Sequence, residues 1–397
     1  VHQMKAKTNR ILATIIAAAM IAGQSVLGVS AESYASNSAV ESEGYSAIKE
    51  AAGDAEMKAL GESIRAGAVA TVKTPQPEAT TGTVYYISND GDDANSGTSA
   101  DAPWQSIQKV NVTTFEPGDM VLFEAGNSWQ LEEPLHPLGS GTADAPIVIG
   151  AYGEGAKPCF DAKAVADDPN RAWAYGDVTK HSSDGLYLED QSHIEVRDLE
   201  IVNAPDGYDG SDSTVQRNLR DDRRGVHVVA TVGSTEKNIQ GVYLHDLYVH
   251  DVTGDAMSAT KWDSSKRSGG IVFETILKDE TTGLPIIKDA LSDTDLKGYE
   301  PAYFSNIIVE NNILIDNGYS SIAFKQLKKW GVRPNGDKTT APQYYHTKEQ
   351  GWYPHYNITI RNNYLDHDKY ELGANTIYLT NSKESLIEHN YCVGAGT

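Results

Sequence analysis

Short stretches of alternating hydrophobic and polar residues recur through the second half of the chain. One kind occurs five times and has apolar residues at every second position. The copies read GLYLED from Gly185, GVHVVA from Gly225, GIVFET from Gly270, SIAFKQ from Ser321 and TIYLTN from Thr376. Because successive side chains of a strand point to opposite faces, this period of two predicts β-strands.

A second, longer kind of stretch follows each of these copies and is interrupted by Asp or Asn. Its copies read IEVRDLEIV from Ile194, VYLHDLYV from Val242, IIVENNILI from Ile307, ITIRNNYLD from Ile358 and, less regularly, LIEHNYCV from Leu386. Five pairs in a fixed order predict one structural unit stacked on itself, which is a solenoid. The sequence therefore predicts an all-β chain folded as a parallel β-helix.

The spacing of the repeats predicts coils that carry insertions. The first stretches start 40, 45, 51 and 55 residues apart, which is longer than a bare coil needs. A leucine-rich repeat would show a helical stretch in a shorter unit, and a β-propeller would show tight hairpins. In repeat proteins such insertions gather on one face, often the binding face. The insertions cover residues 205–224, 250–268, 275–305 and 326–356.

The Asp and Asn residues inside the second stretches predict a sharp corner rather than a chemical site. Asn and Asp tolerate the left-handed backbone that a corner needs, and their side chains can bond along a stack. The residues concerned are Asp198, Asp246, Asn311 and Asn362, followed by Asn312, Asn363 and Asn390.

The segment that precedes the repeats has a distinctive order of strands and turns. It reads YYISNDGDDANSGTSADAPWQSIQKVN, then PGDMVLFEAGNSW, then GSGTADAPIVIGAYG. This segment resembles the N-terminal part of secreted bacterial right-handed parallel β-helix proteins of the pectate-lyase-like group. The resemblance covers roughly residues 83–397 and implies that 83–180 form an N-terminal cap and the first coils, and 181–397 the later coils. It does not choose a chemistry, because the group includes lyases, hydrolases and non-enzymatic proteins.

The first 82 residues predict export and a linker. A basic start at Met4, an apolar stretch and the small residues Val29-Ser30-Ala31 indicate a secretory signal peptide over 4–31. Residues 32–82 are rich in Ala, Ser and Glu and predict a linker, with a weak helical pattern around Ile48–Ile64. We expect a bacterial protein that is secreted or on the cell surface, with no membrane segment after cleavage. The last stretch lacks a polar cap, which predicts coils truncated at the C-terminus.

The balance of acidic and basic residues limits the kinds of molecule that the protein is expected to bind. The 397 residues include 55 acidic and 33 basic ones, for a net charge of −22. This balance argues against nucleic acid, whose phosphates need a basic patch. It also suits a neutral glycan better than a polyanionic one. We expect a polysaccharide partner and a monomer.

Stacking the first stretches aligns their outward residues in columns. One column contains Glu189, Val229, Glu274, Lys325 and Thr380. Adjacent rungs of a sheet lie about 4.8 Å apart, so Glu189 and Glu274, two rungs apart, lie within reach of the carboxylate spacing of inverting glycosidases. The alternative for Glu274 and Lys325 is an ordinary cross-strand ion pair on an exposed face.

Polar residues in two insertions and on one strand predict a glycan cleft beside these carboxylates. Carboxylates, cations and an aromatic ring for stacking on sugars are what such a cleft requires. A solvated charge cluster and a packed loop anchor are the alternatives. The candidates are Asp222 and Asp263 for catalysis, and Arg224, His227, Lys261 and Trp262 for substrate binding.

We therefore predict a secreted glycoside hydrolase that degrades a plant or microbial polysaccharide. Glu274 would be the acid, and Glu189, Asp222 or Asp263 the base. The first alternative is a pectate-type lyase that works by β-elimination, with Lys325 as its base and a calcium ion bound by loop aspartates. The second is a surface β-helix that binds glycans without cutting them.

Overall fold

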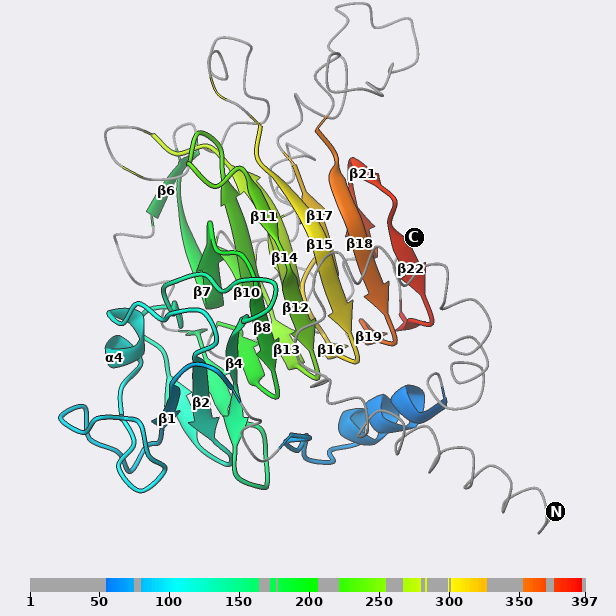
Figure 1. Ribbon diagram of the computed structural model, residues 1–397. Coiled ribbons are helices and arrows are strands. Elements are labelled where there is room, and N and C mark those ends of the chain that lie inside the picture. The colour runs from blue at the N-terminus through cyan, green and yellow to red at the C-terminus, as the bar shows by residue number, and fades with distance from the viewer. Residues whose placement is uncertain are drawn as a thin grey trace, which may run out of the picture.

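A computed structural model describes residues 55–74, 80–163, 172–175, 178–205, 221–254, 267–279, 283, 299, 301–326, 353–368 and 375–394. The strands in these ranges form three sheets, and the chain visits the sheets in turn, coil after coil (Figure 1). Within the described residues every strand pair is parallel except β6 with β7, which confirms the parallel β-helix.

Sheet A has a main path of eight strands. The path is β1 (Val84–Ile87), β2 (Met120–Glu124), β4 (Ile147–Tyr152), β8 (Ile194–Arg197), β12 (Val242–His245), β15 (Tyr303–Glu310), β18 (His355–Arg361) and β21 (Ser382–Lys383). Two short strands join it from the side, β11 (Asn238–Gln240) on β15 and β22 (Leu386–Glu388) on β18.

Sheet B contains the first repeated stretches. Its order is β6 (Ala172–Tyr175), β7 (Val178–Glu189), β10 (Asp222–Thr231), β14 (Gly269–Ile276), β17 (Ser320–Lys325) and β20 (Asn375–Leu379). Sheet C completes each coil with β3 (Ser128–Gln130), β5 (Cys159–Asp161), β9 (Glu200–Asn203), β13 (Tyr248–Val252), β16 (Ile313–Ile315), β19 (Tyr364–Asp366) and β23 (Tyr391–Val393).

Each second stretch of the sequence is divided between sheets A and C by the predicted corner. Asp198, Asp246, Asn311 and Asn362 have φ angles of 58°, 52°, 57° and 54°, which is left-handed backbone. The following asparagines form a ladder, in which the Nδ2 of Asn312 donates to the Oδ1 of Asn363 at 3.0 Å. The Nδ2 of Asn363 then donates to the Oδ1 of Asn390 at 2.8 Å. These contacts confirm the predicted corner.

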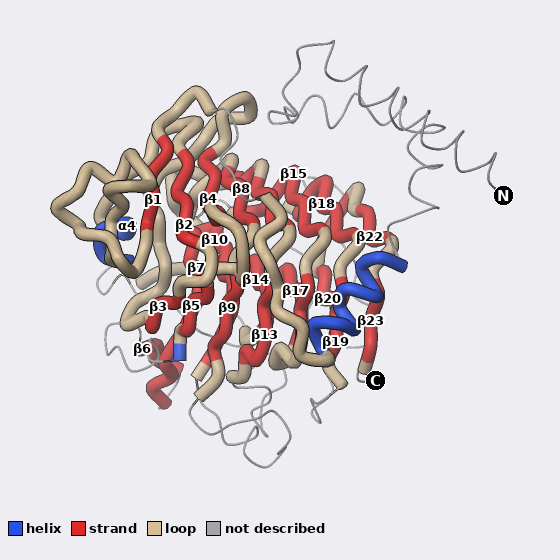
Figure 2. Tube along the Cα trace, turned by 90° about the horizontal axis from the view of Figure 1, so that it is seen from below, coloured by secondary structure: helices blue, strands red, loops and turns tan. Residues whose placement is uncertain are grey.

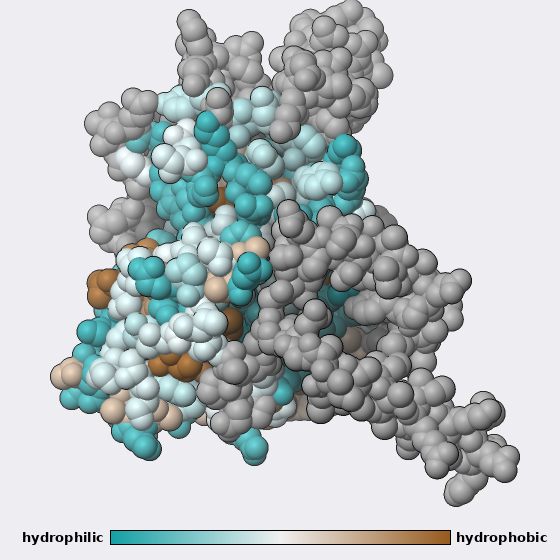
Figure 3. Space-filling view, viewed as in Figure 1, coloured by the Kyte–Doolittle hydropathy of each residue, from teal (hydrophilic) through white to brown (hydrophobic). Residues whose placement is uncertain are grey.

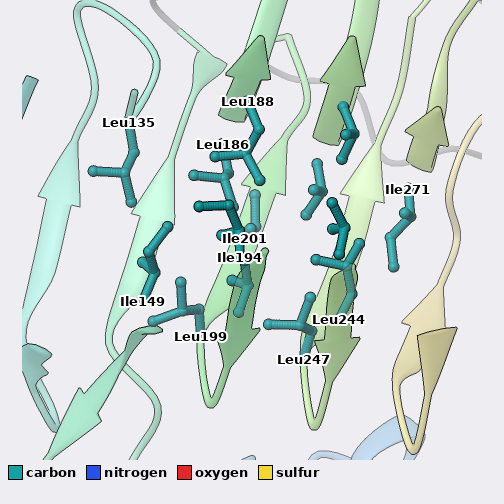
Figure 4. Packing of buried hydrophobic residues seen from close by; sticks show 14 of the residues in the cluster. Leu135, Ile149, Leu186, Leu188, Ile194, Leu199, Ile201, Leu244, Leu247 and Ile271 are labelled. Atoms are coloured by element: carbon teal, nitrogen blue, oxygen red, sulfur yellow. The ribbon is translucent and has the colours of Figure 1, made fainter. Parts of the chain in front are cut away.

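The inward side chains of the three sheets form a continuous apolar core. Figure 4 shows side chains of successive coils, among them Leu186, Leu188 and Ile194, gathered in the interior. Phe273 and Phe324 stack directly, with ring centroids 4.2 Å apart. The cap at the N-terminal end includes the helix α4 (Ile107–Asn111), which buries Ile107 and Val110.

Residues 55–74 fall within the predicted linker 32–82, and they pack against the coils. Residues 55–65 form a helix that lies across the outer face of sheet C, beside β19 and β23 (Figure 2). Its Met57 and Ile64 pack against Ile313, Ile315 and Tyr364. The contact partners lie about 250 residues or more along the chain, so the local pattern predicted part of a helix but not its packing.

Candidate active site

The outward columns of sheet B have the predicted register. Val229 of β10 pairs with Glu189 of β7 on one side and with Glu274 of β14 on the other. Glu274 in turn pairs with Lys325 of β17. The candidate carboxylates therefore lie two rungs apart, as the sequence predicts.

This outward face is buried, whereas the sequence left open an exposed strand surface. His227 is 1% exposed and Glu274 is 3% exposed. The apolar residues Val229, Val272 and Ala323 of the same columns are at most 1% exposed. Charges on this face therefore interact in a medium that screens them less than water does.

Arg224 of β10 belongs to a buried ionic cluster that also contains Asp184 of β7. Its side chain is fully buried, and its Nε donates to the Oδ1 of Asp184 at 2.6 Å. Its guanidinium also donates to the hydroxyl of Ser182 and, at 3.0 Å, to the main-chain carbonyl of Arg267. These contacts hold Arg224 against its own sheet, so it supports the site from within.

His227 lies between two carboxylates from neighbouring strands. Its Nδ1 is 3.3 Å from the Oδ1 of Asp184, and its Nε2 is 3.4 Å from the Oε2 of Glu274. Because the carboxylates contact opposite nitrogens of one ring, they lie about one imidazole width and two contacts apart. The imidazole ring fills the space between Asp184 and Glu274, so these two carboxylates do not themselves flank a glycosidic bond.

The surroundings of Glu274 favour its ionised form. Burial alone would raise the pKa of this carboxyl, but the charge of Arg267, the contact with His227 and the charge of Lys325 hold it well below its ordinary value. The Oε1 atom of Glu274 lies 2.7 Å from Arg267. An ionised carboxylate fits a base or a nucleophile better than the predicted acid.

Lys325 is the second group of this pair with an altered proton affinity. Burial lowers the pKa of its amine to about 7; Glu274 opposes this shift, and Arg267 adds to it. An amine with that pKa is partly neutral at neutral pH and can accept or deliver a proton.

Glu189 belongs to a separate group of contacts at the end of β7. Its carboxylate pairs with Lys278 and accepts a hydrogen bond from the Thr231 hydroxyl at 2.8 Å. Burial opposes ionisation of Glu189, but Lys278 and Thr231 together lower its pKa. Next to it, burial raises the pKa of Asp190 to about 6, and the charge of Glu189 adds to this shift.

The other predicted site residues divide into two groups. Asp222 begins β10, is 1% exposed and aligns with Ser182 of β7, so it lies on the same sheet as Arg224. Lys261, Trp262 and Asp263 lie outside the described residues.

Sequence reasoning did not select two residues of this cluster, Asp184 and Arg267. Asp184 does stand in the column of Arg224, and that alignment was the available signal. Arg267 precedes β14, and its contact with Glu274 depends on how the chain enters the strand, which no repeat pattern shows.

No group of three or more His, Cys, Asp or Glu side chains among the described residues is arranged to hold a metal ion. Most of the loop aspartates that the lyase alternative invokes for calcium, in 206–220 and 255–266, lie outside the described residues. Within the same part of the chain, no helix has both the length and the apolar composition that a membrane crossing needs.

Sequence comparison gives two relatives of known name, whereas no protein-family model matches the chain. A lacto-N-biosidase of Bifidobacterium longum subsp. longum is 31% identical over 344 residues, which is 78% of this chain and 19% of that protein. A pectate lyase of Emericella nidulans is 33% identical over 131 residues, 32% of this chain and 30% of that protein. The chain thus spans less than a third of either relative.

Comparison of structures gives a likeness to a GH136 lacto-N-biosidase from Eubacterium ramulus. The likeness covers 78% of this chain and 51% of that one, with 23% identity and a TM-score of 0.49. The coils described above show a parallel β-helix, which is the fold that the resemblance to the pectate-lyase-like group implies. The longer of the two sequence matches is the one to the lacto-N-biosidase.

Proposed function

We propose that this chain forms the β-helix of a secreted glycoside hydrolase that acts on a glycan. The observation that carries the proposal is the buried cluster on sheet B, in which the Glu274 carboxylate is held by Arg267 and contacts His227, whose other side contacts Asp184. Glycosidases use two carboxyl groups that flank the bond to be cut. The relative named lacto-N-biosidase, which matches most of this chain, supports the same reaction class.

In the proposed reaction, water is added across a glycosidic bond. The anomeric carbon gains the hydroxyl group, the carbon–oxygen bond to the leaving group breaks, and the leaving oxygen gains the proton. Glu274 is the ionised partner of the catalytic pair, because Arg267 and Lys325 stabilise its negative charge. This reverses the roles in the sequence-based hypothesis, so the proton donor is sought among Glu189, Asp222 and Asp263.

A lacto-N-bioside is the first substrate to test, alongside a panel of plant and microbial polysaccharides. The longest open reading frame that contains this chain would be incubated with each, and reducing ends and ultraviolet absorbance of a new C=C bond would be followed together. Reducing ends without absorbance support the hydrolase. Retained glycan binding without any product would instead favour the non-catalytic surface protein.

Lys325 supports a second candidate, a lyase that acts by β-elimination. Its amine lies on the strand next to Glu274, and its pKa of about 7 would let it remove a proton beside a uronate carboxylate. In that case absorbance near the C=C band would rise with pH through about 7 and disappear in Lys325→Met. Absorbance that is absent at every pH excludes this candidate.

A further inference from the structure

His227 has an unusual set of neighbours for a buried histidine. The ring lies on the outward side of β10, 1% exposed, with the Asp184 carboxylate at one nitrogen and the Glu274 carboxylate at the other. The ring of Tyr187, one rung away, lies 5.4 Å from it, centroid to centroid. Ionised carboxylate oxygens can only accept hydrogen bonds, so both ring nitrogens of His227 face acceptor groups.

The carboxylate behind His227 is itself fixed in place. The Oδ1 atom of Asp184 accepts the hydrogen bond from Arg224, and Asp184 and Arg224 are both fully buried. Arg224 also donates to the main chain of Arg267, the residue that pairs with Glu274. The contacts thus run from Arg224 through Asp184 and His227 to Glu274, and return through Arg267.

The side of this cluster near Glu274 has unsatisfied hydrogen-bonding capacity. Among the described residues, neither ring nitrogen of His227 nor the Oε2 of Glu274 has a hydrogen-bond partner, although all three atoms are buried. Ser320, in the column of Arg224, likewise has a buried hydroxyl without a partner in that part of the chain. Buried polar groups are almost always satisfied, so such a concentration calls for a ligand or water to complete it.

We propose that His227 is a positioning residue, which, with Asp184 behind it, orients the Glu274 carboxylate and keeps it ionised for the reaction. This rests on the proposed function of the site. Among the described residues, Arg267, Lys325 and His227 face Glu274, and the charge of Arg224 also acts on it. Asp184, Glu274 and the ring of Tyr187 face His227. Arg267 binds the Oε1 atom, so His227 is the neighbour of Oε2, the oxygen that has no hydrogen bond and remains for substrate or water.

The test compares His227→Gln with His250→Gln in the full-length protein. His250 also lies between two carboxylates, with Nε2 3.1 Å from Glu200 and Nδ1 2.7 Å from Asp251, but it belongs to sheet C. In His227→Gln we expect kcat for a chromogenic lacto-N-bioside to fall about tenfold or more, with KM nearly unchanged. We expect the acid limb of its pH profile to move up by about one unit, because Glu274 loses a contact that favours its ionised form. His250→Gln should keep the wild-type profile.

A second readout does not depend on activity. In protein labelled with ¹³C at the glutamate carboxyls, the Glu274 resonance, assigned from its loss in Glu274→Gln, should titrate at higher pH in His227→Gln than in the wild type. An unchanged pH profile and an unchanged Glu274 titration would overturn the inference, even if activity fell.

Failure of the proposed function and failure of a variant to fold can each be distinguished from failure of the inference about His227. If the wild type cleaves no glycan, the proposed function fails, and the titration still decides whether His227 controls Glu274. If His227→Gln does not fold, Asp184→Asn takes its place, and an unchanged Glu274 titration in that variant would refute the coupling.

Discussion

The buried charges on the outer faces of sheets B and C differ in how fully they are paired. On sheet C, Arg65 of the N-terminal helix pairs with both Asp316 and Asp366, and apolar side chains of the helix pack around the pairs. On sheet B, the charges around Glu274 and His227 leave buried atoms without hydrogen bonds among the described residues. A face whose groups satisfy one another stabilises the fold, whereas a face with unsatisfied groups is suited to a ligand.

On the face shown in Figure 3, hydrophilic residues predominate and hydrophobic ones form only small separate patches. The apolar face of sheet C is instead covered by the helix of residues 55–65.

The largest effect is expected from Glu274→Gln, which removes the proposed ionised carboxylate. Hydrolysis of the lacto-N-bioside should fall by about 10²-fold or more. Glu310→Gln makes the same change on sheet A, where Glu310 pairs with Arg361, and should leave the rate within about twofold of the wild type. Equal losses in both variants would contradict a special role for sheet B.

Arg65→Ala should strongly destabilise sheet C and spare the chemistry. It leaves two carboxylates, each 3% exposed, without their cation, so the free energy of unfolding should fall by about 3 kcal/mol. Denaturant titration measures this, and kcat well below the transition should be unchanged. Lys58→Ala removes an exposed cation of the same helix and should leave the midpoint unchanged.

The free energy of unfolding should also depend on pH through His245. Burial opposes its charge, but contacts with Asp246 and Glu195, at 2.7 and 3.2 Å, raise its pKa to about 9. Since the folded pKa exceeds the unfolded value, this contribution is complete below about pH 6.5 and is lost as pH rises to 9. The difference in stability between the wild type and His245→Gln should shrink by up to about 3 kcal/mol over that range. A constant difference would refute the assignment.

Gly61→Ala should give the smallest effect, with an unusual sign. Alanine normally stabilises a helix by about 0.5–1 kcal/mol relative to glycine. At position 61 a Cβ would lie 2.1 Å from the Cγ of Tyr364, whose hydroxyl donates to Asp366 at 3.0 Å. We therefore expect destabilisation of about 1–3 kcal/mol, measured by denaturant titration. Ser63→Ala, on the exposed side of the helix, is the matched control and should be neutral or slightly stabilising.

The repeat pattern was sufficient to predict the coils, the corner and the register of sheet B, because each depends on the period of the sequence. It could place Glu274 beside Lys325 for the same reason. It could not predict that this face is buried, since burial depends on chain segments outside the aligned strands. The packing of the helix over residues 55–65 was also beyond it, because Gly61 contacts Tyr364 and Arg65 binds Asp366, some 300 residues away.

The candidate site was predicted in part. Arg224, His227 and Glu274 do meet on one sheet, and Asp184, which the sequence analysis did not select, contacts the other side of His227. A column shows which residues align, while the direction in which a long side chain turns depends on the cations around it. Here the carboxylate of Glu189, a predicted base, pairs with Lys278.

A crystal structure of the inactive Glu274→Gln protein with a bound lacto-N-bioside tests the central claim most directly. We predict a sugar hydroxyl or the glycosidic oxygen within hydrogen-bond distance of residue 274 and of the Nε2 of His227, on the outer face of sheet B. A glycan bound on sheet A or sheet C, with the cluster around His227 untouched, would contradict the assignment of this face as the active site.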